Sequence, residues 1–224
     1  MTDARAGAPP NTPLLEVGQL AGIRGERRLF QNLDLTLRAG EVRWLRGRNG
    51  RGKTTLLRML AGLSSPEQGE IRVLGQALRS SPVASRAHVG YIAHANALKD
   101  DLTAAEALTF LGALCGRTPS PPEVVEALKR LGIASRAGAA VRTLSQGQRR
   151  RVALARLALS GGPLVWLLDE PFDALDDRGI EVLNGLLAEH AAAGGAVLLT
   201  SHQALSLRDP APSVLNLDDY SVLA

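Results

Sequence analysis

The pattern of hydrophobic and polar residues along the chain predicts two kinds of β-strand in an α/β fold. Leu33, Leu35 and Leu37 alternate with polar residues, as in a strand with one buried face. Continuous apolar runs at 164–168 and 196–200 predict strands that are buried on both faces of a parallel sheet. Further short strands are expected at 41–46, 71–74 and 89–92.

Capping signals and closing glycines mark the predicted helices. Thr103-Ala-Ala-Glu106 and Ser120-Pro-Pro-Glu123 are capping boxes, the second with proline at the first helical position. The region from about 95 to 160 is therefore predicted to be a mostly helical insertion in an α/β chain. Helices are expected at 54–61, 103–114, 120–131, 145–161 and 178–193.

Composition favours one large globular domain. The chain has 224 residues, 45% of them hydrophobic, which is enough for a substantial core. We expect this domain at 14–217, between a polar N-terminal tail at 1–13 and a short C-terminal tail at 218–224. The single cysteine, Cys115, excludes an internal disulfide and favours a reducing compartment. No apolar run reaches the ~20 residues of a membrane span.

A glycine-rich loop at 47–54 carries the first chemical signal. It reads Gly-Arg-Asn-Gly-Arg-Gly-Lys-Thr and fits the pattern G-x-x-x-x-G-K-[ST], between a predicted strand and a predicted helix. Its backbone N–H groups turn inward around phosphates, Lys53 reaches the β- and γ-phosphates, and the Thr54 hydroxyl binds Mg²⁺. The candidate nucleotide-binding residues are Gly47, Arg48, Asn49, Gly50, Arg51, Gly52, Lys53, Thr54 and Thr55.

Two acidic residues, Asp169 and Glu170, follow the buried strand predicted at 164–168. The carboxyl end of such a strand is where an α/β sheet holds its ligand. Asp169 is placed to bind a metal directly or through water, and Glu170 to polarise a water that attacks the γ-phosphate. The alternative is a pair of solvated acids, which the phosphate loop upstream makes the weaker interpretation.

The segment Leu144-Ser-Gln-Gly-Gln148 places a serine at the start of a predicted helix. Exposed N–H groups and a following glycine there form an anion site, although Ser145 also fits a simple helix cap, and both roles can hold at once. With this segment the chain resembles the ATP-binding-cassette family of ATPases. The motifs occur in the family's order from about residue 14 to 217, and they argue against a P-loop kinase.

The resemblance implies a P-loop NTPase fold of the cassette type, with a parallel-sheet core, an antiparallel β subdomain and an inserted helical subdomain. It implies ATP and Mg²⁺ as cofactors and a homodimer that forms on ATP binding. His202 would contact the γ-phosphate and hold Glu170 and water in line. The residues expected at the nucleotide of the opposite subunit are Ser145, Gly147, Gln148 and Asp176.

Two positions depart from the family's pattern. No aromatic residue stands where the family stacks adenine on a tyrosine, and Arg24 is the candidate for stacking on the base instead. His94 stands where the family has a glutamine that binds Mg²⁺ and water. The candidate metal ligands are therefore Thr54, Asp169 and His94.

A narrower resemblance is to the ATPase subunits of cytochrome c maturation systems, carried by the segments 94–103, 144–157, 165–176 and 200–203. It implies ATP hydrolysis at the cytoplasmic face of the bacterial inner membrane, by a peripheral subunit docked on an integral membrane permease subunit. The complex would serve haem export or haem delivery. Membrane contact would run through the partner only.

Other functions remain open at this point. One is an ATPase for a different cargo, such as a lipid, drug or peptide. Another is a cassette protein that acts on DNA or ribosomes, although such proteins usually have a long coiled-coil insertion or a second cassette. A net charge of +4 does not indicate nucleic acid as a partner. The basic clusters at 46–53 and 149–151 are assigned to the phosphate site and to the solvated start of the helix that follows Ser145.

Overall fold

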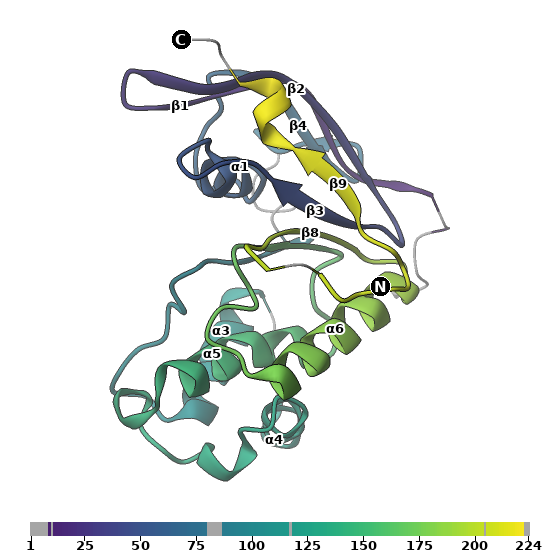
Figure 1. The fold of residues 1–224 in the computed structure, drawn as a ribbon. Coiled ribbons are helices and arrows are strands. Elements are labelled where there is room, and N and C mark those ends of the chain that lie inside the picture. The colour runs from purple at the N-terminus through teal and green to yellow at the C-terminus, as the bar shows by residue number, and fades with distance from the viewer. Residues whose placement is uncertain (1–8, 10, 80–86, 117, 204, 222–224) are drawn as a thin grey trace. The chain divides into compact units, whose positions relative to one another are not determined.

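The computed structural model describes residues 9, 11–79, 87–116, 118–203 and 205–221 (Figure 1). The chain forms two compact units, each built from segments that are separate in sequence. The first unit comprises Met1–Tyr91, Pro163–Asp169 and Ala188–Ala224, and the second unit comprises Ile92–Gly162 and Glu170–Leu187.

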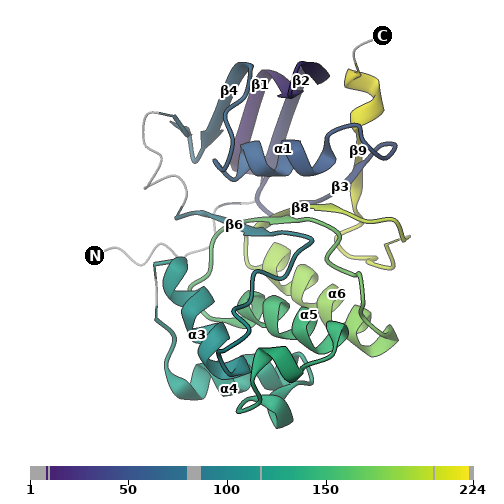
Figure 2. The same cartoon turned by 90° about the vertical axis from the view of Figure 1, so that its left-hand side faces the viewer.

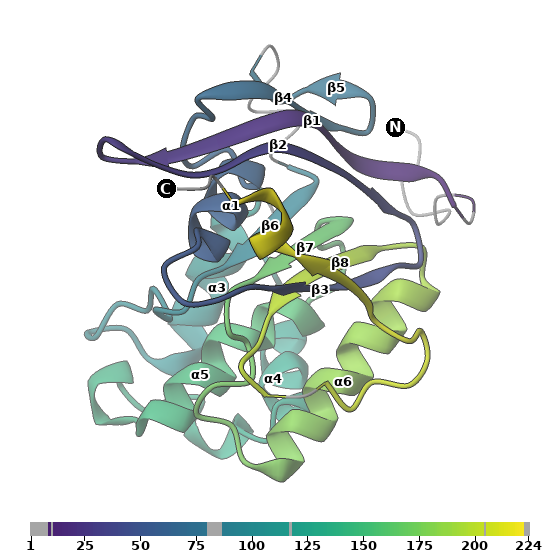
Figure 3. The ribbon, with the colours of Figure 1, turned by 45° about the horizontal axis from the view of Figure 1, so that its top comes forward.

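The described residues of the first unit form two β-sheets (Figures 2 and 3). The antiparallel sheet has the order β2-β1-β4-β5, with β1 (Pro13–Arg24), β2 (Arg27–Arg38), β4 (Gln68–Val73) and β5 (Gln76–Ala77). The other sheet has the order β6-β7-β8-β3-β9, with β3 (Val42–Arg46), β6 (Val89–Ile92), β7 (Val165–Leu168), β8 (Ala196–Thr200) and β9 (Ser213–Asn216).

The core of the first unit lies around α1 (Lys53–Leu60), which contacts both β1 and β7. In β2 the predicted alternation is confirmed, because Leu33, Leu35 and Leu37 are buried whereas Asp34 is exposed. Every residue of β7 and β8 is buried, as their continuous apolar sequences require for strands inside a parallel sheet. Strand β3 pairs in parallel with β8 and β9, and β7 pairs in parallel with β8.

The second unit is helical and contains α3 (Ala104–Leu114), α4 (Pro121–Arg130), α5 (Gln146–Ala155) and the first part of α6 (Asp177–Ala192). Short 3₁₀ turns lie at Ala134–Arg136, Val141–Thr143 and Arg156–Ala158. Both predicted capping boxes, at Thr103 and Ser120, are present at the starts of α3 and α4. Helices α3, α4 and α5 pack on one another through buried aliphatic side chains such as Leu108, Leu128 and Val152.

The last described residues belong to the first unit. The 3₁₀ turn η4 (Leu217–Tyr220) contacts β2 and β3, and Leu217 is fully buried. Residues 1–8, 10 and 222–224, which were expected in the two tails, lie outside the described residues. Among the residues that the structure does describe, no helix is long and apolar enough to cross a membrane.

His190, near the end of α6, packs against β7 and against the residues that precede β7 and β8. Its ring stacks on Trp166 of β7, with centroids 3.7 Å apart and planes within 8°. Its Nε2 atom lies 3.0 Å from the carbonyl oxygen of Leu164, and because a carbonyl only accepts, Nε2 carries the proton. A Cβ at Gly195 would lie 2.2 Å from this nitrogen. Burial lowers the pKa of His190 to about 4.

Candidate functional site

The phosphate loop connects β3 to α1 in the first unit, as predicted. Gly47, Gly50 and Gly52 all have positive φ angles, of 144°, 78° and 103°, which residues with a Cβ rarely adopt. Gly52 is the N-cap of α1, and no side chain caps the helix. The first N–H groups of α1 are therefore available for an anion, with the helix dipole in favour.

Lys53 is folded back onto this loop. Its Nζ atom donates to the carbonyl oxygen of Gly47 at 2.6 Å, and the carbonyl oxygen of Arg48 lies at 3.5 Å. A phosphate oxygen is a charged and therefore stronger acceptor than a carbonyl oxygen. Lys53 is thus held against its own loop by weaker acceptors, which the phosphate oxygens of a bound nucleotide can replace.

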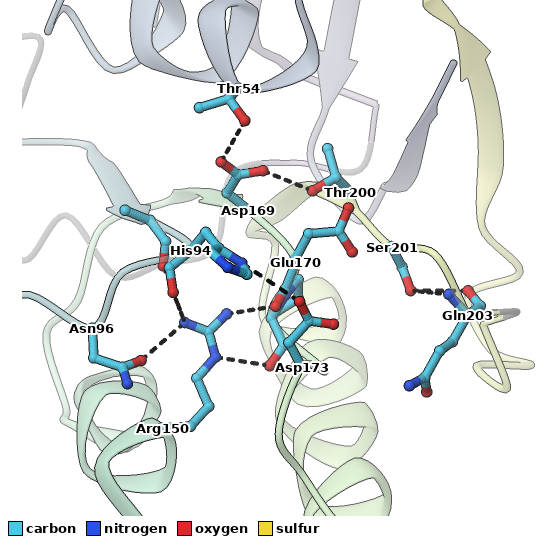
Figure 4. A network of polar contacts seen from close by, with 12 residues as sticks. Thr54, His94, Asn96, Arg150, Asp169, Glu170, Asp173, Thr200, Ser201 and Gln203 are labelled. Atoms are coloured by element: carbon cyan, nitrogen blue, oxygen red, sulfur yellow. Dashed lines mark hydrogen bonds and ion pairs between the residues drawn. The ribbon is translucent and has the colours of Figure 1, made fainter. Parts of the chain in front are cut away.

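Asp169 forms a polar cluster with two threonines at the end of β7 (Figure 4). Its carboxylate accepts hydrogen bonds from Thr54 Oγ1 at 2.8 Å and from Thr200 Oγ1 at 3.0 Å. Asp169 is only 3% exposed. Burial, together with the negative charge of Asp169, also raises the pKa of Tyr91 to about 12, so this tyrosine stays neutral.

The pair formed by Thr54 and Asp169 fits Mg²⁺. A hydroxyl and a carboxylate are hard oxygen ligands, and Mg²⁺ in nucleotide sites is bound by one or two protein oxygens together with substrate phosphates. The hydrogen bond between these side chains shows that the two oxygens already lie close together. Two of the three predicted metal ligands are thereby brought to one place.

A cavity of about 740 Å³ in the first unit joins the phosphate loop to the end of β8. Lys53 and His202 both line it, and its volume is typical of a small-molecule site. His202 is carried by a tight turn, because the Ser201 hydroxyl accepts from the backbone N–H of Gln203 and donates to its carbonyl oxygen. The other lining residues are Trp44, Leu45, Arg46, Gly47, Arg48, Ser201, Val214, Asn216 and Asp218.

Asp218 is a residue of this site that the sequence did not reveal. Its carboxylate accepts from the backbone N–H of Arg48 at 3.1 Å and pairs with the Arg51 guanidinium at 3.2 Å. The turn η4 therefore supports the phosphate loop through Asp218. Only the fold brings residue 218 to residue 48, so no local sequence pattern marks this contact.

In the second unit, Ser145 caps α5 as predicted. Its hydroxyl accepts from the Gln148 backbone N–H at 3.3 Å, and the Gln148 side chain accepts from the Ser145 N–H at 3.0 Å. At Gly147 a Cβ would lie 2.8 Å from the carbonyl oxygen of Ala174, which explains why glycine is needed there. The anion-binding role of Ser145, Gly147 and Gln148 stays a prediction.

Asp176 caps the start of α6. Its carboxylate accepts from the Gly179 backbone N–H at 2.8 Å and also pairs with Arg151. The hydrogen bond from Gly179 is the main reason that the pKa of Asp176 is lowered. Its expected contact across a dimer interface stays a prediction.

Glu170, His94 and Arg24 are three further predicted site residues. Glu170 is 8% exposed and has a left-handed backbone, with φ of 47°. His94 lies in the second unit, where its Nδ1 atom is 3.4 Å from an Asp173 carboxylate oxygen, and its contact with a metal stays a prediction. Arg24 is exposed at the tip of the β1–β2 hairpin, and its stacking on a base likewise stays a prediction.

One expectation from the sequence was wrong. Arg150 was placed in the solvated start of α5, but it is 2% exposed. A run of three arginines at 149–151 carries no signal for which side chain turns inward. The helix places position 150 toward the interior of the second unit, where backbone carbonyls receive it.

The fold and the site define a P-loop nucleotide-binding protein. A family model described as ABC transporter matches residues 30–173, and the chain belongs to this family.

Relatives and solved structures agree with this assignment. A "Cytochrome c biogenesis ATP-binding export protein CcmA" from Dechloromonas aromatica is 45% identical over 204 residues, which cover 91% of this chain and 98% of the relative. A protein of the same name from Vibrio cholerae is 44% identical over 206 residues, or 92% and 99% of the two chains. The structure of a putative ABC transporter ATP-binding protein from Pyrococcus furiosus matches with a TM-score of 0.79 and 26% identity, over 93% of this chain and 99% of the other.

Proposed function

We propose that this protein is the ATP-hydrolysing subunit of an ABC transporter complex that serves cytochrome c biogenesis through haem export or haem delivery. The observation that carries the ATPase part is the cavity lined by both Lys53 and His202, together with the paired oxygens of Thr54 and Asp169. The names of the relatives, which cover almost the whole chain, support the biological role.

Each residue of the site has a separate role in the proposed hydrolysis of ATP. The loop N–H groups and Lys53 bind the phosphates, and Thr54 and Asp169 hold Mg²⁺, which neutralises charge on the phosphates. Glu170 accepts a proton from the attacking water as general base, because it follows the metal-binding Asp169 directly. His202 holds the γ-phosphate from the other side of the cavity through its ring.

Assembly completes the site in this proposal. Two copies pack head to tail with ATP, and each offers the N-terminus of α5, beginning at Ser145, to the nucleotide of the other. An integral membrane permease subunit holds the pair at the cytoplasmic face of the inner membrane. The name of the relatives, which describes an ATP-binding export protein, supports such a partner.

The ATPase role is tested by comparing wild type with Glu170→Gln in an assay of phosphate release from Mg-ATP. The variant should bind ATP as wild type does, while hydrolysis falls by about 10²- to 10⁴-fold, the usual contribution of a general base. Glu181→Gln is the matched control, because it makes the same change on the exposed side of α6. Equal rates for Glu170→Gln and the control would exclude Glu170 as the base.

The biological role is tested by haem staining of membrane proteins from a host that lacks the gene. Covalent c-type cytochromes should return with wild type and with Glu181→Gln, but not with Glu170→Gln. Normal c-type cytochromes in the host without the gene would refute the haem role, and an ATPase for a different cargo would then be the better interpretation.

A further inference from the structure

Arg150 is a buried charged side chain in α5 with no role in the proposed chemistry so far. At 2% exposure its guanidinium has left water, which is costly unless hydrogen bonds replace the lost hydration. An arginine on the exposed face of a helix keeps its hydration and does not need hydrogen bonds from the protein to replace it. The burial therefore indicates that the fold uses this group for a specific purpose.

The guanidinium holds two segments that are far apart in sequence (Figure 4). From one side it donates to the carbonyl oxygens of Glu170 at 2.6 Å and Pro171 at 3.3 Å. From the other side it donates to the carbonyl oxygens of Ala93 at 3.0 Å and His94 at 3.4 Å, and to Asn96 Oδ1 at 3.2 Å. All of these residues lie in the second unit.

The segment that Arg150 holds is strained. Glu170 and Ala174 have positive φ angles of 47° and 62°, and such backbone conformations persist only where the surroundings impose them. Two residues of α5 contact the segment 170–174. Arg150 donates to the carbonyl oxygen of Glu170, and Gly147, which has no Cβ, lets the carbonyl of Ala174 approach the start of the helix.

We propose that Arg150 is a positioning residue for ATP hydrolysis, which fixes the main chain of Glu170 and ties it to the 93–96 loop and to α5. The inference rests on the proposed function, in which Glu170 is the general base. Arg150 acts through Glu170 and does not contact the nucleotide. Its planar set of five donors is suited to several carbonyls at once, whereas a lysine ammonium has three donors and no fixed plane.

Arg150→Lys tests the proposal, because it keeps the positive charge but loses the planar geometry. We expect the kcat for Mg-ATP to fall about 10- to 100-fold, since a displacement of about 1 Å at a reacting group has this effect. The affinity for a fluorescent ATP analogue should stay within about twofold of wild type, because the phosphate loop is unchanged. Arg150→Gln, which keeps fewer donors, should lose more activity.

Lys129→Met is the matched control, because it removes one charge of the second unit from an exposed side chain that pairs with Glu126. It should leave both kcat and ATP affinity unchanged. Thermal unfolding of each variant, followed by circular dichroism, shows whether the chain has folded. If Arg150→Gln fails to fold, Arg150→Lys still decides the question.

A double-variant experiment separates positioning from general support of the fold. In a Glu170→Gln background, where no base remains to be positioned, Arg150→Lys should change the residual single-turnover rate by less than about twofold. The same fold loss in both backgrounds would overturn the proposal, as would a folded Arg150→Lys variant with wild-type kcat. If wild type itself does not hydrolyse ATP, or Glu170→Gln does not slow hydrolysis, the proposed function fails instead.

Discussion

His190 makes the stability of the protein depend on pH in a predictable way. The ring is enclosed between Trp166 and Gly195, and burial lowers its pKa from 6.5 to about 4. Between these two values the unfolded chain binds a proton that the folded chain rejects. The contribution of His190 to stability is therefore fully present above pH 6.5 and is lost as the pH falls toward 4.

The size of this loss of stability follows from the difference between the two pKa values, which is about 2.5. Each pKa unit corresponds to about 1.36 kcal/mol. The loss attributable to His190 is about 1 kcal/mol at pH 5.5 and at most about 3 kcal/mol near pH 4. A few kcal/mol is a large part of the net stability of a domain, so the effect is measurable.

The assay is urea unfolding of wild type and His190→Phe from pH 7.5 to pH 4.5. Phenylalanine keeps a ring against Trp166 but does not titrate. The loss of the hydrogen bond between His190 and Leu164, together with the different shape of phenylalanine, changes the free energy of unfolding by the same amount at every pH. Other titrating groups cancel in the difference between the variants. Wild type should therefore lose stability relative to His190→Phe as the pH falls, and a constant difference would refute the reasoning.

Two further predictions concern the site. Lys53→Ala should weaken ATP binding by about 10- to 100-fold, the worth of a hydrogen bond to a charged group, in a fluorescence titration, and equal affinity would exclude contact with the phosphates. Gly147→Ala should cost about 1–3 kcal/mol and lower the Tm by several degrees, because its Cβ would meet the Ala174 carbonyl at 2.8 Å. Gly185→Ala, whose Cβ meets nothing within 4 Å, is the control, and an equal Tm for the two variants would contradict the packing argument.

Much of the fold and of the first unit's site could be predicted from local patterns. The phosphate loop, the buried strand before Asp169 and the capping boxes at Thr103 and Ser145 are each written in a few adjacent residues, and the structure contains all of them. Their chemistry depends on backbone geometry over one turn, which is why a short sequence specifies it.

Contacts between distant segments could not be predicted in this way. Asp218 binds the phosphate loop 170 residues earlier in the chain, and Arg150 reaches carbonyls near residues 93 and 170. Both contacts arise from tertiary packing and leave no periodic signal. For Asp176 the resemblance to the family implied only a role at the nucleotide of the opposite subunit, whereas in the structure this residue caps α6.

Arg150 holds its two segments mainly through main-chain oxygens, and among the contacts described above only Asn96 takes part through its side chain. Main-chain oxygens of Ala93, His94, Glu170 and Pro171 are the same for every amino acid, so this attachment sets no requirement on the side chains at those positions. The loop can therefore exchange glutamine for histidine at position 94 and still be held in the same place. A different side chain at position 94 can thus change the chemistry of this loop while its hydrogen bond to Arg150 remains.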